Sequence, residues 1–298
     1  MDILSIFRTF QTQEQCIEYL EQVRWGDEPC CVYCGSIKVC RHASGDRANQ
    51  RWQCQDCHRA FAVTVGTIFH RTHVPLQNWF LLLGLMLNAK KSASACQLAR
   101  DLGMRRATVW SMMHRVRVAM AEDQKQSRLL YGLVEADECY IGGKPRKANR
   151  HKDDDQNPPR KRGRGTAKAA VIGAIERGGR VIAEPTDSVS GKAIERFINR
   201  IVDRAGTLLL TDQFGGYHRV GKTMNWASVN HEFEYVNGIV HTNTMEGFWG
   251  LLKRALYGQH HHYSREYLPL YVSEACYKYN HRHSPDGFRS LVATMLAA

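Results

Sequence analysis

The chain has 298 residues, with 41 basic and 29 acidic side chains, a formal charge of +12 and ten cysteines. This length accommodates two or three compact domains, and no run approaches the roughly 20 apolar residues that a membrane span needs. The first residues lack the features of a signal peptide, which predicts a cytoplasmic protein. The positive charge makes nucleic acid the leading partner class, although a merely soluble basic protein has the same charge.

Four cysteines form two Cys-x-x-Cys pairs, Cys31 with Cys34 and Cys54 with Cys57, separated by 19 residues. This spacing lets two tight turns present four thiolates to one Zn²⁺ ion. Closed four-sulfur sites are structural, so we expect a zinc ribbon whose metal stabilises the fold without taking part in catalysis. Four neighbours fit no such spacing and are expected at the ribbon surface: Cys30, Cys40, His42 and His58.

Apolar residues at helical spacing predict three helices in the next segment, over 76–87, 92–101 and 108–120. Gly103 can adopt the left-handed backbone that a tight turn between the last two helices requires. The pattern predicts a helix-turn-helix whose second helix enters the major groove of DNA. The candidate donors to phosphates and base edges are Arg105, Arg106, Thr108, Ser111, His114, Arg115 and Arg117. The alternative is a helical hairpin with a solvated basic face.

Residues 144–168 are rich in Lys and Arg and poor in apolar side chains. Such a segment cannot form a core and predicts a mobile loop that orders on DNA by neutralising phosphates. Lys161, Arg162 and Arg164 are its candidate DNA-binding residues. A solubilising insert without a binding role is the alternative.

The rest of the chain alternates strand and helix patterns and predicts an α/β sheet. The expected strands are 133–141, 169–176, 180–185 and 207–211, and the expected helices are 190–202 and 244–257. The second and third strands form a hairpin across residues 177–179.

The first of these strands contains three carboxylates, Glu135, Asp137 and Glu138. Repelling acids in a strand indicate a divalent cation, and strand alternation lets only one of Asp137 and Glu138 face a shared metal. Asp212 ends a buried strand, at the edge where ligands of open α/β sheets collect. Its alternative role is to cap the following turn.

The last predicted helix has Glu246 and Lys253 on one face, two turns apart, which suits a carboxylate that holds a metal and an ammonium that meets a phosphate. Asn243 and Glu246 also have the spacing of a capping box, in which Glu246 would fold back onto the helix start. Acids on two strands and a following helix can converge. Together they predict two-metal, in-line phosphoryl transfer with Asp137, Asp212 and Glu246 as the acids.

Several stretches carry a resemblance to a known family: Cys-Val-Tyr-Cys-Gly-Ser from Cys31, Val-Gly-Thr-Ile-Phe from Val65, Val-Glu-Ala-Asp-Glu-Cys-Tyr-Ile-Gly-Gly-Lys from Val134, Arg-Gly-Arg-Gly-Thr from Arg162, and His-Thr-Asn-Thr-Met-Glu-Gly-Phe-Trp from His241. In these the chain resembles bacterial insertion-sequence DDE transposases of the ISXO type, which carry an N-terminal zinc ribbon.

The resemblance implies a ribonuclease-H-like mixed sheet with flanking helices, catalytic Mg²⁺ or Mn²⁺, and strand transfer without a covalent enzyme intermediate. It implies terminal inverted repeats and target DNA as partners, with a homodimer or larger homo-oligomer assembled on DNA at the nucleoid. Position by position, Asp137 and Asp212 are the first two acids. Relatives have Asn or Glu as the third, and Glu246 is preferred over its neighbour Asn243 because a carboxylate binds a hard cation better than an amide.

The expected domains are a zinc ribbon with an N-terminal helix (1–70), a helix-turn-helix region (71–125) and a catalytic domain (126–298). The consecutive histidines 260–262, with His241, resemble a second metal site, but three adjacent side chains rarely converge on one ion. One or two of them are instead expected to contact DNA phosphates or the transition state. Two other functions are weighed against a transposase: a zinc-ribbon transcriptional regulator, and a stand-alone nuclease. A regulator has no use for carboxylates that face bound phosphates.

Overall fold

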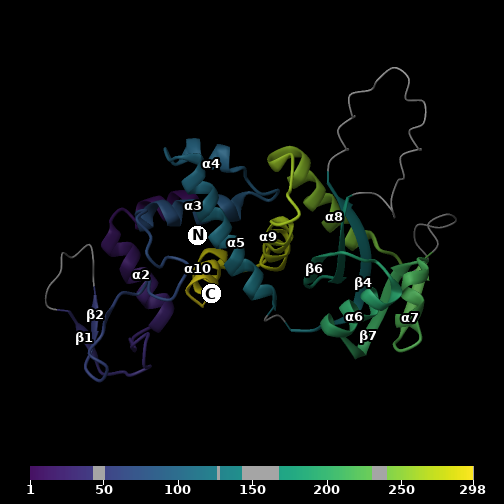
Figure 1. Cartoon of the computed structure of the whole chain (residues 1–298), viewed down its shortest axis with the longest axis horizontal. Coiled ribbons are helices and arrows are strands. Elements are labelled where there is room, and N and C mark those ends of the chain that lie inside the picture. Colours follow the sequence, from purple (N-terminus) through teal and green to yellow (C-terminus); the bar gives the residue numbers. More distant parts are fainter. Residues whose placement is uncertain (43–50, 126–127, 143–167, 230–239, 298) are drawn as a thin grey trace, which may run out of the picture. The chain divides into compact units, whose positions relative to one another are not determined.

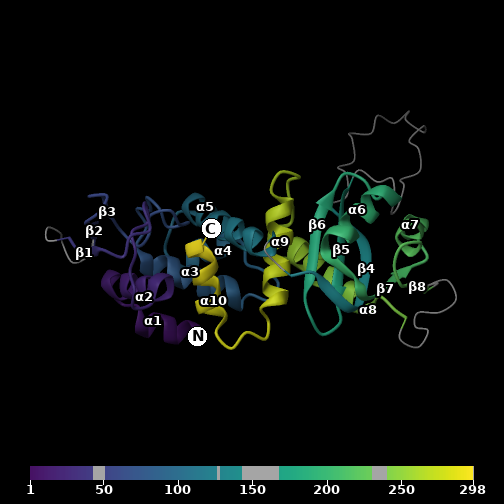
Figure 2. The same cartoon turned by 90° about the horizontal axis from the view of Figure 1, so that it is seen from below.

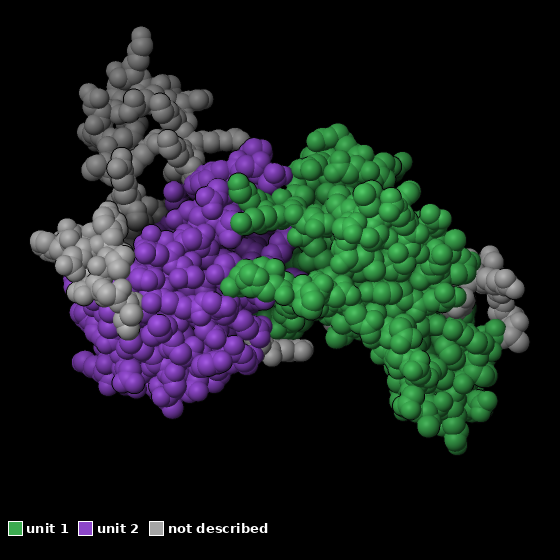
Figure 3. Space-filling model, turned by 180° about the vertical axis from the view of Figure 1, so that it is seen from behind, with its two compact units in different colours: residues 1–126, 281–298 green, residues 127–280 purple. Residues whose placement is uncertain are grey.

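The computed structural model describes residues 1–42, 51–125, 128–142, 168–229 and 240–297, which divide into two compact units (Figure 3). Unit 1 comprises Met1–Gln126 and His281–Ala298, and unit 2 comprises Ser127–Asn280. The expected catalytic domain ran from 126 to 298, so the structure differs from it at the C-terminus. There the last helix folds with the N-terminal unit.

Unit 1 is built on helices around an aromatic core. Its helices are α1 (Ile3–Thr9), α2 (Gln13–Trp25), α3 (Leu76–Asn88), α4 (Ala95–Asp101), α5 (Arg106–Lys125) and α10 (Gly287–Ala297). Phe10, Tyr19, Phe80 and Phe288 pack with ring centroids 4.7 to 6.1 Å apart. Phe288 lies on α10, and its burial among these rings explains why the C-terminal helix belongs to unit 1.

The N-terminal ribbon of unit 1 is a three-stranded antiparallel sheet in the order β1 (Val39–Arg41), β2 (Trp52–Cys54), β3 (Ala60–Phe61). The second and third strands flank the second cysteine pair. Glu21 of α2 joins helix to ribbon: its carboxylate accepts hydrogen bonds from both terminal nitrogens of Arg41, at 2.8 and 2.6 Å, and from Trp52 Nε1 at 2.7 Å.

The helix pair α4 and α5 turns at Gly103, which has φ +63° as the sequence predicted. The backbone N–H of Met104 donates to the carbonyl of Ala99 at 2.9 Å and closes the turn. Helix α4 begins three residues later than expected because Ser94 caps it, accepting from the N–H of Gln97 at 3.2 Å.

Unit 2 is built on a five-stranded mixed sheet in the order β6-β5-β4-β7-β8 (Figure 2). Its strands are β4 (Leu130–Ile141), β5 (Ala169–Glu176), β6 (Val181–Thr186), β7 (Val202–Asp212) and β8 (Trp226–Val229). The first three form an antiparallel meander, and β7 and β8 join parallel on the other side of β4. This order is that of a ribonuclease-H-like fold, which confirms the predicted class.

Helices cover both faces of this sheet (Figures 1 and 2). One face packs on α6 (Gly191–Ile201), the 3₁₀ turn η2 (Gly215–Tyr217) and α7 (His218–Gly221). The other packs on α8 (Asn243–Ala255), its π-helical extension η3 (Leu256–His260) and α9 (Leu268–Asn280). Among the described residues, no helix is both long and apolar enough to span a membrane.

Candidate active site and zinc ribbon

The two strand acids of unit 2 lie side by side. In the parallel pairing of β4 and β7, Glu135 is opposite Leu210. Continuing this register by two residues places Asp137 beside Asp212, at the C-terminal end of β7. Register partners in neighbouring strands point to the same face. The sheet therefore brings together two acids that are far apart in the sequence.

Asp137 faces α8, where Trp249 Nε1 donates to its Oδ2 at 3.1 Å. Gly173 is the partner of Asp137 on β5, and a Cβ there would lie 2.4 Å from Met245 Cε and 2.8 Å from the Trp249 ring. Only glycine lets the helix approach this closely. The Trp249 side chain therefore holds the Asp137 carboxylate in place.

The surroundings of the Asp137 carboxyl disfavour its charged form. Burial, followed by the nearby charges of Glu138 and Asp212, raises its pKa from 3.8 to about 7. Removal from water and neighbouring negative charges both disfavour the carboxylate. A divalent cation between these oxygens would reverse that preference, so the donor set fits Mg²⁺ or Mn²⁺.

The neighbouring acids separate as strand alternation predicted. Glu138 points to the opposite face, where it accepts a hydrogen bond from the hydroxyl of Tyr217 at 3.3 Å. Asp212 Oδ1 accepts from the N–H of Phe214 at 3.1 Å. The predicted turn cap is therefore present, and it orients the Asp212 carboxylate at the strand end.

The predicted capping box of Asn243 and Glu246 does not form, although the Glu246 side chain does fold back onto the helix start. The N-cap residue of α8 is Thr242, whose own side chain makes no capping hydrogen bond, and Asn243 is already helical. The Thr242 hydroxyl instead donates to Glu246 Oε1 at 3.4 Å. Both Glu246 and Asn243 are exposed at the start of the helix.

Glu246 and Lys253 share a stripe of α8 with Trp249, at positions three before and four after it. Because Trp249 is hydrogen-bonded to Asp137, Glu246 and Lys253 lie on either side of Asp137 along the helix. Asn243 lies a further turn away. The carboxylates of Asp137, Asp212 and Glu246 do not, however, lie within 4.8 Å of one another. Within the described ranges, only the four ribbon cysteines form a group of three or more candidate metal ligands that are this close together.

Glu135 is a residue that the sequence interpretation left without a role. It is fully buried and bonds to the start of α8, accepting from the backbone N–H groups of Thr244 at 2.8 Å and Met245 at 3.0 Å. Its Oε1 also lies 2.6 Å from Arg177 Nε and 3.3 Å from His241 Nδ1. Strand alternation gave the available signal, since Glu135 lies on the same face of β4 as Asp137. His241 thus belongs to the anchor of α8.

The basic helix α5 offers fewer DNA donors than expected. Arg105, Arg106 and Ser111 are exposed, and Thr108 is half-buried. His114 and Arg117 are buried, with 8% and 1% exposure, so their expected contact with DNA is wrong. Helical periodicity turns them toward the core of unit 1.

Arg115 is also engaged within unit 1. Its guanidinium donates to the carbonyl of His70 at 3.0 Å and lies 5.5 Å from the Trp79 ring centroid. Burial lowers the pKa of Arg115. The other predicted DNA-binding residues, Lys161, Arg162 and Arg164, lie outside the described residues, as does most of the basic loop.

Of the three consecutive histidines, His260 packs against the rings of Tyr263 and Tyr271, with centroids 5.4 and 4.8 Å away. His261 adopts φ +59° at the end of η3. In the described part of the chain, none of the three histidines lies within 4.8 Å of two other candidate metal ligands, as the four ribbon cysteines do.

The four ribbon cysteines form a compact sulfur cluster in unit 1. The Sγ atoms of Cys31 and Cys57, and of Cys34 and Cys54, are 3.6 Å apart. The N–H of Cys57 donates to Cys54 Sγ at 3.5 Å, and this bond leads the effects that lower the pKa of Cys54 to about 7. Four sulfurs with thiolate-stabilising backbone donors fit Zn²⁺. Cys30, Cys40, His42 and His58 lie outside the cluster.

Purified protein is expected to contain about one zinc ion per chain, and Cys54→Ser is expected to lose it and unfold the ribbon. Structural zinc contributes directly to folding, by roughly 10 kcal/mol or more in small zinc domains. Metal analysis and near-ultraviolet circular dichroism measure both effects. Cys30→Ser is the matched control and should retain the zinc; equal loss in both variants would contradict the four-sulfur assignment.

Together these features define a class: a ribonuclease-H-like protein with paired carboxylates on its central strands and a cysteine ribbon in a separate unit. Residues 129–280 match the family model of the ISXO2-like transposase domain, and residues 11–60 match the transposase zinc-ribbon domain. The chain belongs to the ISXO2-like transposase family and is a transposase. The regulator and the stand-alone nuclease are therefore not favoured.

A curated relative supports this membership. The chain is 28% identical over 272 residues, 89% of this chain and 90% of the relative, to an "Uncharacterized protein in transposable element ISH50" of Halobacterium salinarum. That organism is an archaeon, so the expected bacterial origin stays a prediction.

Solved structures of Mos1 transposase also match. The Mos1 mariner paired end complex with Mn has 15% identity and a TM-score of 0.32, over 72% of this chain and 75% of that one. The Mos1 Strand Transfer Complex has 14% identity and a TM-score of 0.30, over 73% and 75%. The fold assignment rests on the sheet order of unit 2.

Proposed function

We propose that this transposase cleaves and joins the ends of an insertion sequence by Mg²⁺-dependent phosphoryl transfer, with Asp137, Asp212 and Glu246 as its metal-binding carboxylates. The observation that carries the proposal is the parallel register of β4 and β7, which ends at Glu135 opposite Leu210 and, continued by two residues, brings Asp137 beside Asp212. The raised pKa of Asp137 supports it, because burial first, and then the charges of Glu138 and Asp212, disfavour a carboxylate that a bound cation would stabilise.

The chain's own residues have distinct tasks in this proposal. Trp249 holds one oxygen of Asp137, and the N–H of Phe214 holds one oxygen of Asp212. Lys253 lies one turn beyond Trp249, where its ammonium can meet a phosphate oxygen. Bound Mg²⁺ or Mn²⁺, as one ion or two, would supply Lewis acidity at the phosphoryl group and activate the attacking hydroxyl.

The DNA partners proposed are the terminal inverted repeats and the target, bound by a homodimer or larger homo-oligomer in the cytoplasm. DNA binding is supported by an exposed face at the start of α5. It carries Arg106, Ser111 and the half-buried Thr108, and Arg105 lies just before the helix. The formal charge of +12 favours phosphate contact over the whole surface.

The direct test incubates the purified chain with labelled element ends, Mg²⁺ and a target plasmid. We expect Mg²⁺-dependent cleavage at the element ends and joining of those ends to the plasmid. Cleavage without joining would instead identify a nuclease, and DNA binding without either reaction would overturn the proposal.

The third acid can be distinguished from its neighbour in the same assay. Glu246→Gln should lower joining by about a thousandfold, since a metal-carboxylate contact in the transition state is worth several kcal/mol. The joining rate of Asn243→Ala should stay within about tenfold of the wild-type rate, which is at the low end of the effects of residues that support metal ligands. The reverse order of effects would make Asn243 the third ligand.

A further inference from the structure

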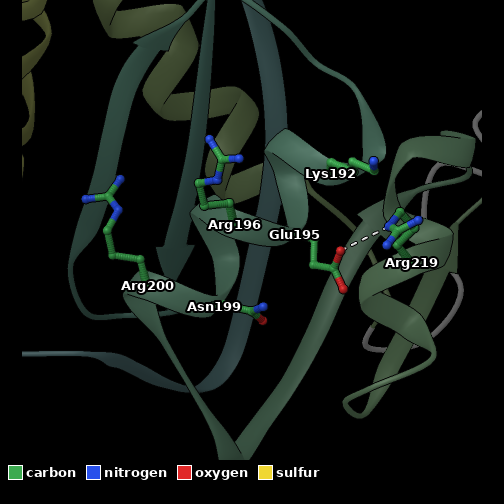
Figure 4. Close-up of a pocket in the computed structure, with 6 residues that line it drawn as sticks. All are labelled: Lys192, Glu195, Arg196, Asn199, Arg200 and Arg219. Atoms are coloured by element: carbon green, nitrogen blue, oxygen red, sulfur yellow. Dashed lines mark hydrogen bonds and ion pairs between the residues drawn. The ribbon is translucent and has the colours of Figure 1, made fainter.

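A basic hollow on unit 2 lies apart from the acids and has no role in the function proposed above. Its volume is about 590 Å³, and Figure 4 shows its lining from α6 and α7. The lining residues are Lys192, Glu195, Arg196, Asn199, Arg200 and Arg219. Four cations thus surround one carboxylate, with no aromatic ring or aliphatic side chain among them.

The cations follow one face of α6. Lys192, Arg196 and Arg200 recur every four residues, so they form a row about 12 Å long at 1.5 Å per residue. Arg219 borders the hollow from α7, where its Nε bonds to Glu195 Oε2 at 3.0 Å. Arg200 pairs with Glu184 at 2.6 Å, and both arginine side chains remain 55% exposed.

Two of these cations have no acidic partner among the residues that the structure describes. Across the parts of the chain that the structure describes, Lys192 and Arg196 are exposed and have no carboxylate within ion-pair distance. Adjacent uncompensated cations repel each other. The row therefore carries a net positive potential that an anion can neutralise.

The hollow is connected to the acids through the chain that follows β7. The start of α6 touches this segment, since a Cβ on Gly191 would lie 3.3 Å from the carbonyl oxygen of Gly216 and 2.9 Å from Arg219 Cδ. The segment begins at Asp212, and its Tyr217 reaches Glu138 on β4. The hollow lies on the face of the sheet opposite Asp137, so a polyanion bound at the acids would reach the row around the end of β7 that carries Asp212.

We propose that the hollow between α6 and α7 binds consecutive backbone phosphates of the DNA whose scissile phosphate lies at Asp137 and Asp212. A row of about 12 Å matches three to four phosphates of one strand, which repeat every 3.4 Å along the duplex axis. Long, exposed Lys and Arg side chains with few neutral donors suit phosphate contact without base readout. This inference rests on the proposed function.

The test compares wild type with Lys192→Gln/Arg196→Gln in DNA binding without added Mg²⁺, over a range of salt concentrations. Loss of two phosphate contacts should reduce the slope of log K against log salt by about 2. Affinity for element ends and for unrelated duplex DNA should fall by the same factor. End joining should recover toward the wild-type rate at low salt, because the lost interaction is electrostatic.

The matched control is Arg8→Gln/Arg289→Gln, which removes the same charge from exposed positions of α1 and α10 in unit 1. Its salt slope should stay at the wild-type value. An unchanged slope in the α6 variant, or an equal change in both, would overturn this inference while leaving wild-type joining intact. Failure of wild-type chain to join ends would instead refute the proposed function, and the slopes would still report on the hollow.

Discussion

Replacement of Asp137 or Asp212 by Asn is expected to lower Mg²⁺-dependent cleavage and joining of element ends by at least about a thousandfold, with DNA binding intact. Each change removes a charge where two carboxylates lie side by side, and lost metal contacts in a phosphoryl-transfer transition state are worth several kcal/mol. Strand-transfer products on gels and binding by fluorescence anisotropy measure the two properties. Wild-type joining by either variant would refute the site.

The stability of Asp137→Asn shows whether its loss of activity is due to misfolding. The pKa of Asp137 is about 7 in the native state, against 3.8 as its ordinary value. Native protein therefore retains a proton that the unfolded chain has lost, and stability falls as pH rises from about 4 to 7. Asp137→Asn should be more stable than wild type at pH 8 without Mg²⁺, by up to about 4 kcal/mol. The gain should vanish near pH 3.5.

Thermal unfolding at both pH values tests this expectation. Added Mg²⁺ should raise the melting temperature of wild type at pH 8 and have less effect on the Asn variant, because binding to the native state alone stabilises it. Lower stability of Asp137→Asn at pH 8 would show that the carboxylate stabilises the metal-free fold and is not strained there.

Glu135→Ala is expected to destabilise unit 2 by about 3 to 5 kcal/mol, the cost of removing one partner of a buried ion pair. The change leaves Arg177 and the N–H groups of Thr244 and Met245 without their carboxylate. The start of α8 should loosen, and Glu246 would move with it. Amide hydrogen exchange at Thr244 and Met245 should accelerate more than exchange in β5.

Glu184→Ala is the control for this variant. Its carboxylate is 40% exposed and pairs with Arg200 on the surface, so its loss should cost under about 1 kcal/mol. Urea unfolding gives both free energies. Equal small effects of the two variants would contradict the anchoring role of Glu135, whereas Glu135→Gln should recover part of the stability because an amide oxygen can still accept from α8.

Much of the fold was predictable because its signals are local. The hairpin across 177–179, the buried strand ending at Asp212 and the turn at Gly103 depend on periodicity and on residues with special backbone freedom. Cysteine spacing likewise predicted the ribbon, since two tight turns suffice to gather four sulfurs. The limits of α4 differed, because Ser94 rather than an earlier residue caps the helix.

The C-terminal boundary was not predictable in this way. Residues 281–298 carry an ordinary amphipathic helical pattern, which fits either neighbouring domain. Phe288 selects unit 1 by packing against Phe10 and Phe80, residues more than 200 positions earlier in the sequence. Such long-range packing leaves no local signal.

The sequence by itself determined the chemical content of the site: acids in strands, a carboxylate and an ammonium two turns apart on one helix, and four cysteines. Only the tertiary structure decided how they are combined. The parallel register of β4 and β7, continued two residues beyond Glu135 and Leu210, brings Asp137 beside Asp212, and the buried Glu135 fixes the start of α8. Packing also removed His114 and Arg117 from the DNA-binding face. Residue types and spacing are local properties, whereas strand register and burial depend on contacts between distant parts of the chain.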